Sequence, residues 1–538
     1  MRRAQTSRVS PFLAPREWAI VSAVLWLVLN FFCLERFPTV FIDEAENANH
    51  AYNAAFHGHA VFSLYDDLYP SRLKFLRQSW PPVIRPFFVQ SLAIFIKRVG
   101  FSLFRVRLFS LSLGFLCLLL VYETGVILSR PALGMGALAI LGTYFPFLYS
   151  CHSIRPEIFL AFDGLCLFLA LLVALRNNHR AAYLLAGVLA GIAPGFHTNG
   201  AAFTVPLFLI LLFSRRWRGL LWGLIGWMTG ALLFIHFADW ERFLPGYGAL
   251  FFREFTTPPL LASRGHFLKI ALDESQRYFG SWIFGQWAGG LLFNRLLSIQ
   301  HVFLGGAVLW GCVGPLRKSE KLAAVFATSL AIAYAFLVGQ KASNYLTALA
   351  PFFALSAAAW LLYYVPLLLS AGQLNSKAKA IHAGVVLAGW IVFSITAVGA
   401  ISLIFSISSY QPSFKTWTQR LSARIPITAR VAGPQILWLG MSSYDYRDAG
   451  VLVWYRLLLN EKNLWKPLEG WKPDYLILDA SLAARLAHLA QEPHQPAMLG
   501  PTGFLPWPHE VMDYFLTGPA YGDAVALIHI HWPRGLSK

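Results

Sequence analysis

Long apolar stretches follow one another along this chain, separated by short polar or basic segments. Many approach the roughly 20 residues that an α-helix needs to cross the hydrocarbon core of a bilayer, and none alternates as the strands of an outer-membrane barrel do. The pattern predicts a mainly α fold, a polytopic transmembrane helical bundle of eleven spans. These spans cover residues 18–36, 106–128, 132–150, 157–175, 181–196, 200–213, 218–237, 300–315, 322–338, 346–368 and 381–407.

Basic clusters in the connecting segments predict the side of the membrane on which each segment lies. They are MRRAQTSR at the start, RNNHR, RRWR and RKSEK between spans, and Lys377 with Lys379. Because Lys and Arg accumulate in cytoplasmic loops, the N-terminus is placed in the cytoplasm and, after an odd number of spans, the C-terminus outside. The first apolar run has no small-residue cleavage site, which predicts a retained signal anchor in the inner (cytoplasmic) membrane of a bacterium.

One further apolar stretch, residues 81–100, is not counted as a span, because a twelfth span would move RNNHR, RRWR and RKSEK outside. Its modest length and its flanking Arg85, Lys97 and Arg98 are typical of an interfacial helix. We therefore expect it to lie in the outer leaflet, within the first external loop.

The chain changes character after the last span. Residues 1–407 are predicted to form the transmembrane domain, with external loops at 37–105 and 238–299, and residues 408–538 to form a small external, periplasmic α/β domain. Its predicted strands are 436–440, 474–480 and 524–532, and its predicted helices are 444–459 and 481–490.

Composition agrees with a membrane protein, at 57% hydrophobic and 13% charged residues and a mean hydropathy of +0.54. The formal charge of +18 would suggest nucleic-acid binding in a soluble protein, but here much Lys and Arg lies in short loops, where topology explains it. No nucleic-acid partner is expected. The five cysteines lie in or beside apolar stretches without paired ligand spacing, which argues against a disulfide framework or a zinc ribbon.

The first external loop begins with the segment FIDEAENANHAYNAAFHGH, which places the adjacent carboxylates of Asp43 and Glu44 just after the first span. As a helix, it would carry Asp43 and His50 on a polar face opposite Ala45 and Ala48, as an amphipathic helix on the membrane does. A structural interpretation is available, since Asp43 as N-cap and Glu46 three residues later would form a capping box. The motif alone does not require catalysis.

Polar groups at the ends of other spans fall on the same predicted side as Asp43. They are Arg155, Glu157, His197, Asn199 and Lys341. Because ionisable groups at membrane depth are costly unless they face a cavity or a partner, these residues predict one polar cavity at the outer face.

At the level of motifs, the chain resembles the membrane-embedded glycosyltransferases of the family 39 type with the C superfamily fold, which include protein O-mannosyltransferases and the transferases that add aminoarabinose to lipid A. The motifs that carry this resemblance are FIDEAENANHAYNAAFHGH, PPVIRPFFVQSLAIFIKRVGFSLFRVRLFSLSLG, SIRPEIF, GFHTNG and NYLTALAPFFALSAA. Together they cover most of residues 15–370, and the tail after residue 408 adds little.

The resemblance implies transfer of a sugar from an undecaprenyl- or dolichyl-type polyprenyl phosphate, on the non-cytoplasmic face, to a hydroxyl of a lipid, glycan or protein acceptor. It also implies that an acid of the first-loop Asp-Glu motif acts; Asp43 is the candidate general base, with Glu44 beside it. A lipid phosphate leaves as a stable anion, so no general acid is required, unlike in two-carboxylate glycosidases. Single displacement should invert the anomeric centre.

Charge on the departing phosphate requires cations or hydrogen-bond donors aimed at it. The candidates for this role are Arg155, His197, Lys341, Arg72 and Arg85, and the candidates for lining the cavity are Glu157, Asn199, Tyr345 and His50. The sequence departs from the aminoarabinose branch, which has TKG where this chain has Thr198, Asn199 and Gly200, and a Lys where this chain has Trp80. The aminoarabinose donor is therefore not implied.

Two weaker metal hypotheses arise from spacing. Glu46 and His50 stand four residues apart, as two ligands on a helix would, so a divalent metal is an open possibility for the cavity. His529 and His531 near the C-terminus share one face of a predicted strand, where a solvated surface is the favoured interpretation.

Two other classes of protein fit some of these features. A transporter or flippase of lipid-linked sugars would share an ionisable cavity, but such proteins usually show repeated halves with interrupted helices, and the sequence shows no internal repeat. A membrane-anchored binding factor would act through residues 411–538 instead.

Overall fold

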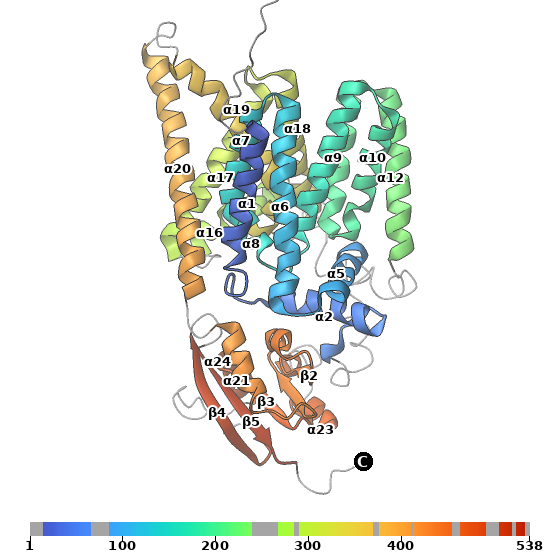
Figure 1. Ribbon diagram of the computed structural model, residues 1–538, viewed down its shortest axis with the longest axis vertical. Coiled ribbons are helices and arrows are strands. Elements are labelled where there is room, and N and C mark those ends of the chain that lie inside the picture. The colour runs from blue at the N-terminus through green and yellow to red at the C-terminus, as the bar shows by residue number, and fades with distance from the viewer. Residues whose placement is uncertain are drawn as a thin grey trace, which may run out of the picture.

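The structure is a computed structural model, and Figure 1 shows its arrangement: a bundle of long helices with a sheet-containing region below one end. The residues it describes are 14–65, 85–238, 267–284, 290–339, 341–369, 376–409, 413–453, 463–490, 505–518 and 523–532. Within this part of the chain each predicted span corresponds to a helix or to a pair of short helical segments.

The helices of the bundle run roughly parallel in Figure 1. Their bounds are α1 Pro15–Phe31, α6 Leu103–Leu128, α7 Pro131–Thr143, α8 Phe145–Cys151, α9 Glu157–Asn177, α10 Arg180–Ile192, α11 Thr204–Phe213, α12 Trp217–Phe237, α16 Phe267–Phe284, α17 Gly290–Val313, α18 Lys318–Leu337, α19 Ala350–Leu369 and α20 Ser376–Ser409. Among the described residues, six helices are long and apolar enough to cross a membrane, or seven if one bent pair counts as a span. The count of eleven spans stays a prediction.

The bent pair is α7 and α8, which meet at 70° where the sequence predicts one span over 132–150. Tyr144 between them is extended, and Pro146 stands in the first turn of α8. A proline inside a continuous helix removes a hydrogen bond and clashes with the carbonyl four residues earlier, so a new helix begins here.

Two helices, α2 Ile42–His57 and α5 Pro86–Val99, lie across the lower end of the bundle in Figure 1. With 14 residues, α5 measures about 21 Å and is too short to span, as expected for residues 81–100. A proline opens it and Gly100 follows it, while Gly58 with φ of 77° ends α2 in the left-handed region that glycine favours.

The predicted start and polar face of α2 were both wrong. Its N-cap is Phe41, whose backbone N–H donates to Glu44, so Asp43 is not the cap and Glu46 completes no box with it. Asn47 and His50 are buried together with the alanines, because protein covers both faces of α2. The exposed apolar side chains near its ends, Phe41 and Phe56, are suited to contact with lipid.

Residues after α20 form a five-stranded mixed sheet of order β2-β1-β3-β5-β4, in which β1 pairs parallel with β2 and β3, and β5 pairs antiparallel with β3 and β4. The strands are β1 Arg430–Gly433, β2 Asp445–Asp448, β3 Tyr475–Asp479, β4 His509–Gly518 and β5 Asp523–Ile530, with helices α21 Phe414–Ser422, α23 Lys466–Trp471 and α24 Ala480–Leu489.

Three elements of the tail were predicted correctly, namely the strands at 474–480 and 524–532 and the helix at 481–490. The predicted strand 436–440 is a 3₁₀-helix, Gln435–Gly440, and the predicted helix 444–459 begins instead with β2. Strand β4 was not predicted, because its polar edge positions weaken the apolar alternation that marks a strand.

The sheet region packs against α2 through aromatic rings. Trp438 lies 5.5 Å from Tyr52 and 5.2 Å from Phe101 between ring centroids, and Gln435 donates to the carbonyl of Ile42 at 3.5 Å. Helix α2 is therefore held between the bundle and the sheet, which fixes the position of its first turn.

Candidate active site

Glu44 is locked in a buried ion pair. Arg107 of α6 donates from Nε and Nη2 to its two oxygens at 2.9 and 2.7 Å, and both side chains are at most 1% exposed. The N–H of Ile154 donates to the same carboxylate at 3.1 Å, and Arg107 Nη1 reaches the carbonyls of Leu34 and Phe37. Glu44 thus ties the first turn of α2 to α6 and to two loops, and its oxygens are fully occupied.

Asp43 points in a different direction, because adjacent residues on a helix are about 100° apart. Its Oδ2 accepts from Arg155 Nη1 at 2.9 Å, and its side chain is 40% exposed. Within the described part of the chain no donor lies on Oδ1. Of the carboxylates gathered here, Asp43 is the one with an oxygen open to a reactant.

Arg155 bridges Asp43 to Glu157, the first residue of α9. Its Nη2 and Nε donate to Glu157 Oε1 at 2.9 and 3.2 Å, and Asn344 Nδ2 donates to the same oxygen at 2.6 Å. Burial opposes the charge on Arg155, but the carboxylates of Glu157 and Asp43 outweigh it and raise the pKa of Arg155. The guanidinium is therefore a permanent cation that keeps both carboxylates in place.

His197 and Tyr345 form the next layer, with ring centroids 5.4 Å apart. Burial, helped by the charge of Arg85, lowers the pKa of His197 to about 3, so its ring is neutral at neutral pH. Because its Nδ1 accepts from the N–H of Asn199 at 3.1 Å, the remaining proton is assigned to Nε2. His197 is thus a neutral hydrogen-bond donor. Burial and Glu157 raise the pKa of Tyr345 to about 12, which keeps its hydroxyl protonated.

Arg85 and Arg277 supply further positive charge beside these rings. Arg85 Nη1 donates to Asn47 at 3.4 Å, and its Nε has no partner among the described residues. The guanidinium of Arg277 lies 5.8 Å from the centre of the Tyr345 ring, and its buried Nη1 likewise has no described partner. Each retains an N–H group that could donate to an anion.

Lys341 is directed elsewhere. Its ammonium donates to Glu274 at 2.7 Å and to the carbonyls of Ala335 and Val338 at 3.1 and 3.0 Å, and Glu274 also accepts from Arg277. Three acceptors use the three N–H groups of an ammonium. Lys341 therefore balances Glu274, which in turn orients Arg277.

Three other residues were predicted for the site, namely Arg72, His50 and Glu46. Arg72 lies outside the described residues. His50 is buried beside Phe62, 5.3 Å between ring centroids, and burial lowers its pKa to about 3. Among the described residues, the one group of three side chains that could hold a metal ion is Glu510, His529 and His531, so the Glu46 and His50 pair stays a prediction.

Sequence reasoning missed four residues of the site: Arg107, Glu274, Arg277 and Asn344. Arg107 stands in the first turns of a long apolar helix, where an unpaired charge is expensive, and this signal could have indicated its acidic partner. Asn344 precedes Tyr345 in the NYLTALAP motif. Glu274 and Arg277 lie in the long loop predicted over 238–299, which the structure shows to include α16.

Substitution of Arg155 by Lys tests the bridge between Asp43 and Glu157. The ammonium of lysine lacks the planar fork with which a guanidinium reaches both carboxylates. We therefore expect any activity that depends on Asp43 to fall by about 10- to 100-fold, which corresponds to roughly 1.4–2.8 kcal/mol of lost transition-state stabilisation. Turnover of purified Arg155→Lys protein would be measured beside Arg98→Lys, an exposed position on α5. Equal activity in both variants would mean that the bridge does not orient Asp43.

Comparisons with known proteins show what the sequence and the fold of this chain are similar to. Residues 80–240 match the sequence model of the family described as dolichyl-phosphate-mannose-protein mannosyltransferase. The structure of ArnT from Cupriavidus metallidurans bound to undecaprenyl phosphate is similar over 98% of this chain and 100% of that chain, with a TM-score of 0.55 and 13% identity. The apo structure of the same protein gives 95% and 98% coverage, a TM-score of 0.58 and 12% identity. A search of curated protein sequences gave no match.

The fold predicted from the sequence is therefore confirmed: the chain has the C superfamily fold of membrane-embedded glycosyltransferases, a helical membrane bundle with a small C-terminal sheet. At these identities the similarity establishes the fold alone. What the site does must be argued from its own residues.

Proposed function

We propose that this protein is a glycosyltransferase that moves a sugar from a polyprenyl phosphate to an acceptor hydroxyl on the outer face of a bacterial inner membrane. The match of residues 80–240 to a lipid-phosphate-dependent family and the similarity to a structure bound to undecaprenyl phosphate support the class of donor. In this proposal the N-terminus is cytoplasmic, and the sheet region and the Asp43 site are periplasmic.

The observation that carries the proposal is the difference between three neighbouring carboxylates. Glu44 is enclosed with Arg107, and Glu157 is 1% exposed and accepts from Arg155 and Asn344, whereas Asp43 is 40% exposed with Oδ1 open. A general base must reach the proton that it removes. Asp43 is therefore the base, and Glu44 and Glu157 hold it and Arg155 in position.

The reaction is a single displacement. The acceptor oxygen forms a bond to the anomeric carbon, its proton passes to Asp43 Oδ1, and the bond from that carbon to the phosphate oxygen breaks with its electron pair on the phosphate. Attack opposite the leaving group inverts the anomeric centre. Since the lipid phosphate is already a stable anion, the reaction requires no general acid.

The departing phosphate is stabilised by groups that keep an unused donor: Arg85, Arg277 and the Nε2–H of His197. Arg155 contributes charge, and each of its three nitrogens already donates to Asp43 or Glu157. Its positive charge also lies beside the carboxylates of Asp43 and Glu157, and it holds both side chains in position.

The test is incubation of the purified protein with a panel of undecaprenyl phosphate sugars and an extract of lipid, glycan and peptide acceptors, followed by mass spectrometry. We expect free undecaprenyl phosphate and one new glycosidic product, which would also identify the sugar and the acceptor. Movement of the lipid across reconstituted vesicles without glycosidic bond formation would indicate a flippase instead and would refute the transferase proposal.

A further inference from the structure

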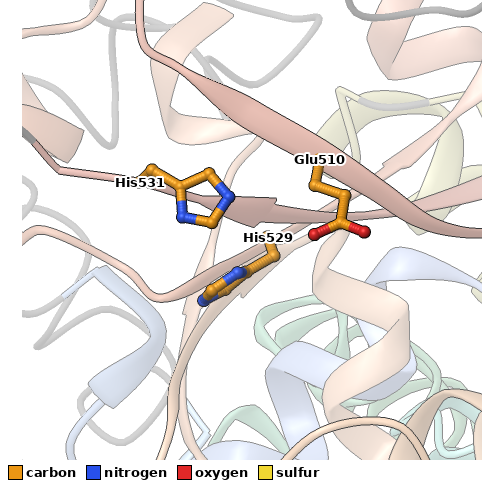
Figure 2. A group of neighbouring side chains, drawn as sticks. All are labelled: Glu510, His529 and His531. Atoms are coloured by element: carbon orange, nitrogen blue, oxygen red, sulfur yellow. The ribbon is translucent and has the colours of Figure 1, made fainter.

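Three potential metal ligands meet on the sheet, outside the Asp43 site. His529 on β5 and His531, the residue directly after this strand, share a face, since Ile528 and Ile530 between and beside them are buried. Glu510 on β4 is the direct partner of His529 in the antiparallel register. Figure 2 shows the three side chains gathered on one side of the two strands.

The packing around these ligands holds them together. The His529 ring lies 4.7 Å from the His531 ring and 4.9 Å from the ring of Tyr475, its partner on β3, between centroids. The N–H of His531 donates to the carbonyl of Pro508 at 2.8 Å, which keeps the end of β5 beside the start of β4. The backbone is thus fixed, while Glu510 and His531 are exposed enough to adjust their side-chain torsions.

The three donor atoms lie close enough together to bind one metal ion. One donor atom from each residue lies within 4.8 Å of the others. Tetrahedral zinc with bonds of about 2.0–2.1 Å places its donors roughly 3.4 Å apart, so small torsional changes bring the three to an ion. Two imidazoles and one carboxylate are the donor set that Zn²⁺ and its neighbours in the first transition row prefer, whereas Ca²⁺ and Mg²⁺ prefer oxygen donors.

We propose that Glu510, His529 and His531 bind one divalent transition-metal ion of the zinc class, with solvent at the fourth position. The carboxylate offsets part of the charge of the ion, and the ion joins β4, the edge strand of the sheet, to β5. The site is separate from the Asp43 cluster and does not depend on the proposed transferase activity. From the sequence a solvated surface was the favoured interpretation for His529 and His531, because β4, which supplies Glu510, was not predicted.

Cobalt(II) is the probe, because a tetrahedral nitrogen and oxygen site gives Co²⁺ much stronger visible absorption, at longer wavelength, than octahedral solvated Co²⁺ has. The full-length protein, purified and stripped with a chelator, would be titrated with Co²⁺ and then with Zn²⁺ as competitor, with metal content measured by mass spectrometry. We expect about one equivalent of Co²⁺ with tetrahedral absorption, displaced by Zn²⁺.

Substitutions of Glu510, His529 and His531 test whether these residues are the metal ligands. His529→Ala and His531→Ala should weaken Co²⁺ binding by more than about 100-fold, and Glu510→Gln, which preserves shape, by at least about 10-fold, since even outer-shell partners of metal ligands are worth 10- to 100-fold. The matched control is His488→Ala, an exposed histidine on α24 of the same region. Circular dichroism would confirm that each variant is folded. No tetrahedral absorption in the wild type, or the same absorption in folded Glu510→Gln and His529→Ala, would overturn the proposal.

Discussion

Asp43→Asn should abolish transfer from a polyprenyl phosphate sugar, with a loss of about 10²–10⁴-fold, the usual contribution of a general base. Asparagine keeps the size of the side chain and can still accept a hydrogen bond from Arg155, but it cannot take the proton of the acceptor hydroxyl. The measurement is the initial rate of undecaprenyl phosphate release by the purified variant, at equal amounts of folded protein judged by size-exclusion chromatography.

The control for this prediction is Glu35→Gln. Glu35 is also an acid shortly after α1, but it pairs with Lys415 at 3.7 Å on an exposed surface, so its substitution should leave the rate within about two-fold. Full activity of Asp43→Asn would remove Asp43 as the base. Loss of activity with unchanged substrate binding would locate the defect in the chemical step.

The helical part of the fold could be predicted because nearly every residue of a long segment contributes to its apolar character. Apolar runs of 17–26 residues are difficult to interpret as anything other than helices, and α6, α9 and α12 lie close to their predicted spans. Breaks within the predicted helices were harder to predict. The bend at Tyr144 depends on one proline in an apolar sequence, and proline is tolerated in many membrane helices.

For the candidate site, the types of residue and the end of the helical bundle at which they lie could be predicted from the sequence. Which charged side chains pair with one another could not. Asp43, Arg155, Glu157, His197 and Tyr345 were all expected at one cavity, and the structure brings them together. The partner of each charge depends on side-chain direction, which changes by about 200° when a helix start shifts by two residues, as from Asp43 to Phe41. The predicted cap at Asp43 oriented α2 incorrectly, so Glu44 was kept as a second catalytic candidate beside Asp43, although the structure buries it.

Polar side chains buried in α2 explain why its hydrophobic pattern was misleading. Asn49 and Asn53 bond to Ser63 and to each other, and Asn47 donates to the carbonyl of Ile154. Each buried amide has a partner, so burial is tolerated. These bonds connect α2 to the loops around it, and they make this helix a fixed support for Asp43.

Arg107→Met should destabilise the folded protein by about 3–5 kcal/mol, because it leaves the buried Glu44 carboxylate without its counter-charge. Glu44 would keep only the N–H groups of Ile154 and Phe41. We expect a lower unfolding temperature and a reduced folded fraction in detergent, measured by tryptophan fluorescence and size-exclusion chromatography. Arg105→Met is the matched control, since Arg105 is exposed on the same turn of α6, and its effect should lie within about 0.5 kcal/mol.

The double variant Glu44→Gln with Arg107→Met separates a structural role of the pair from a chemical one. Removing both charges avoids an unpaired buried ion, so the double variant should be more stable than Arg107→Met alone, with a coupling free energy of about 1–3 kcal/mol. If the pair only positions α2, recovered stability should bring back part of the transferase activity, since Asp43 and Arg155 are unchanged. A double variant that folds as well as the wild type but remains fully inactive would instead assign Glu44 to the chemistry, because stability would then no longer explain the loss.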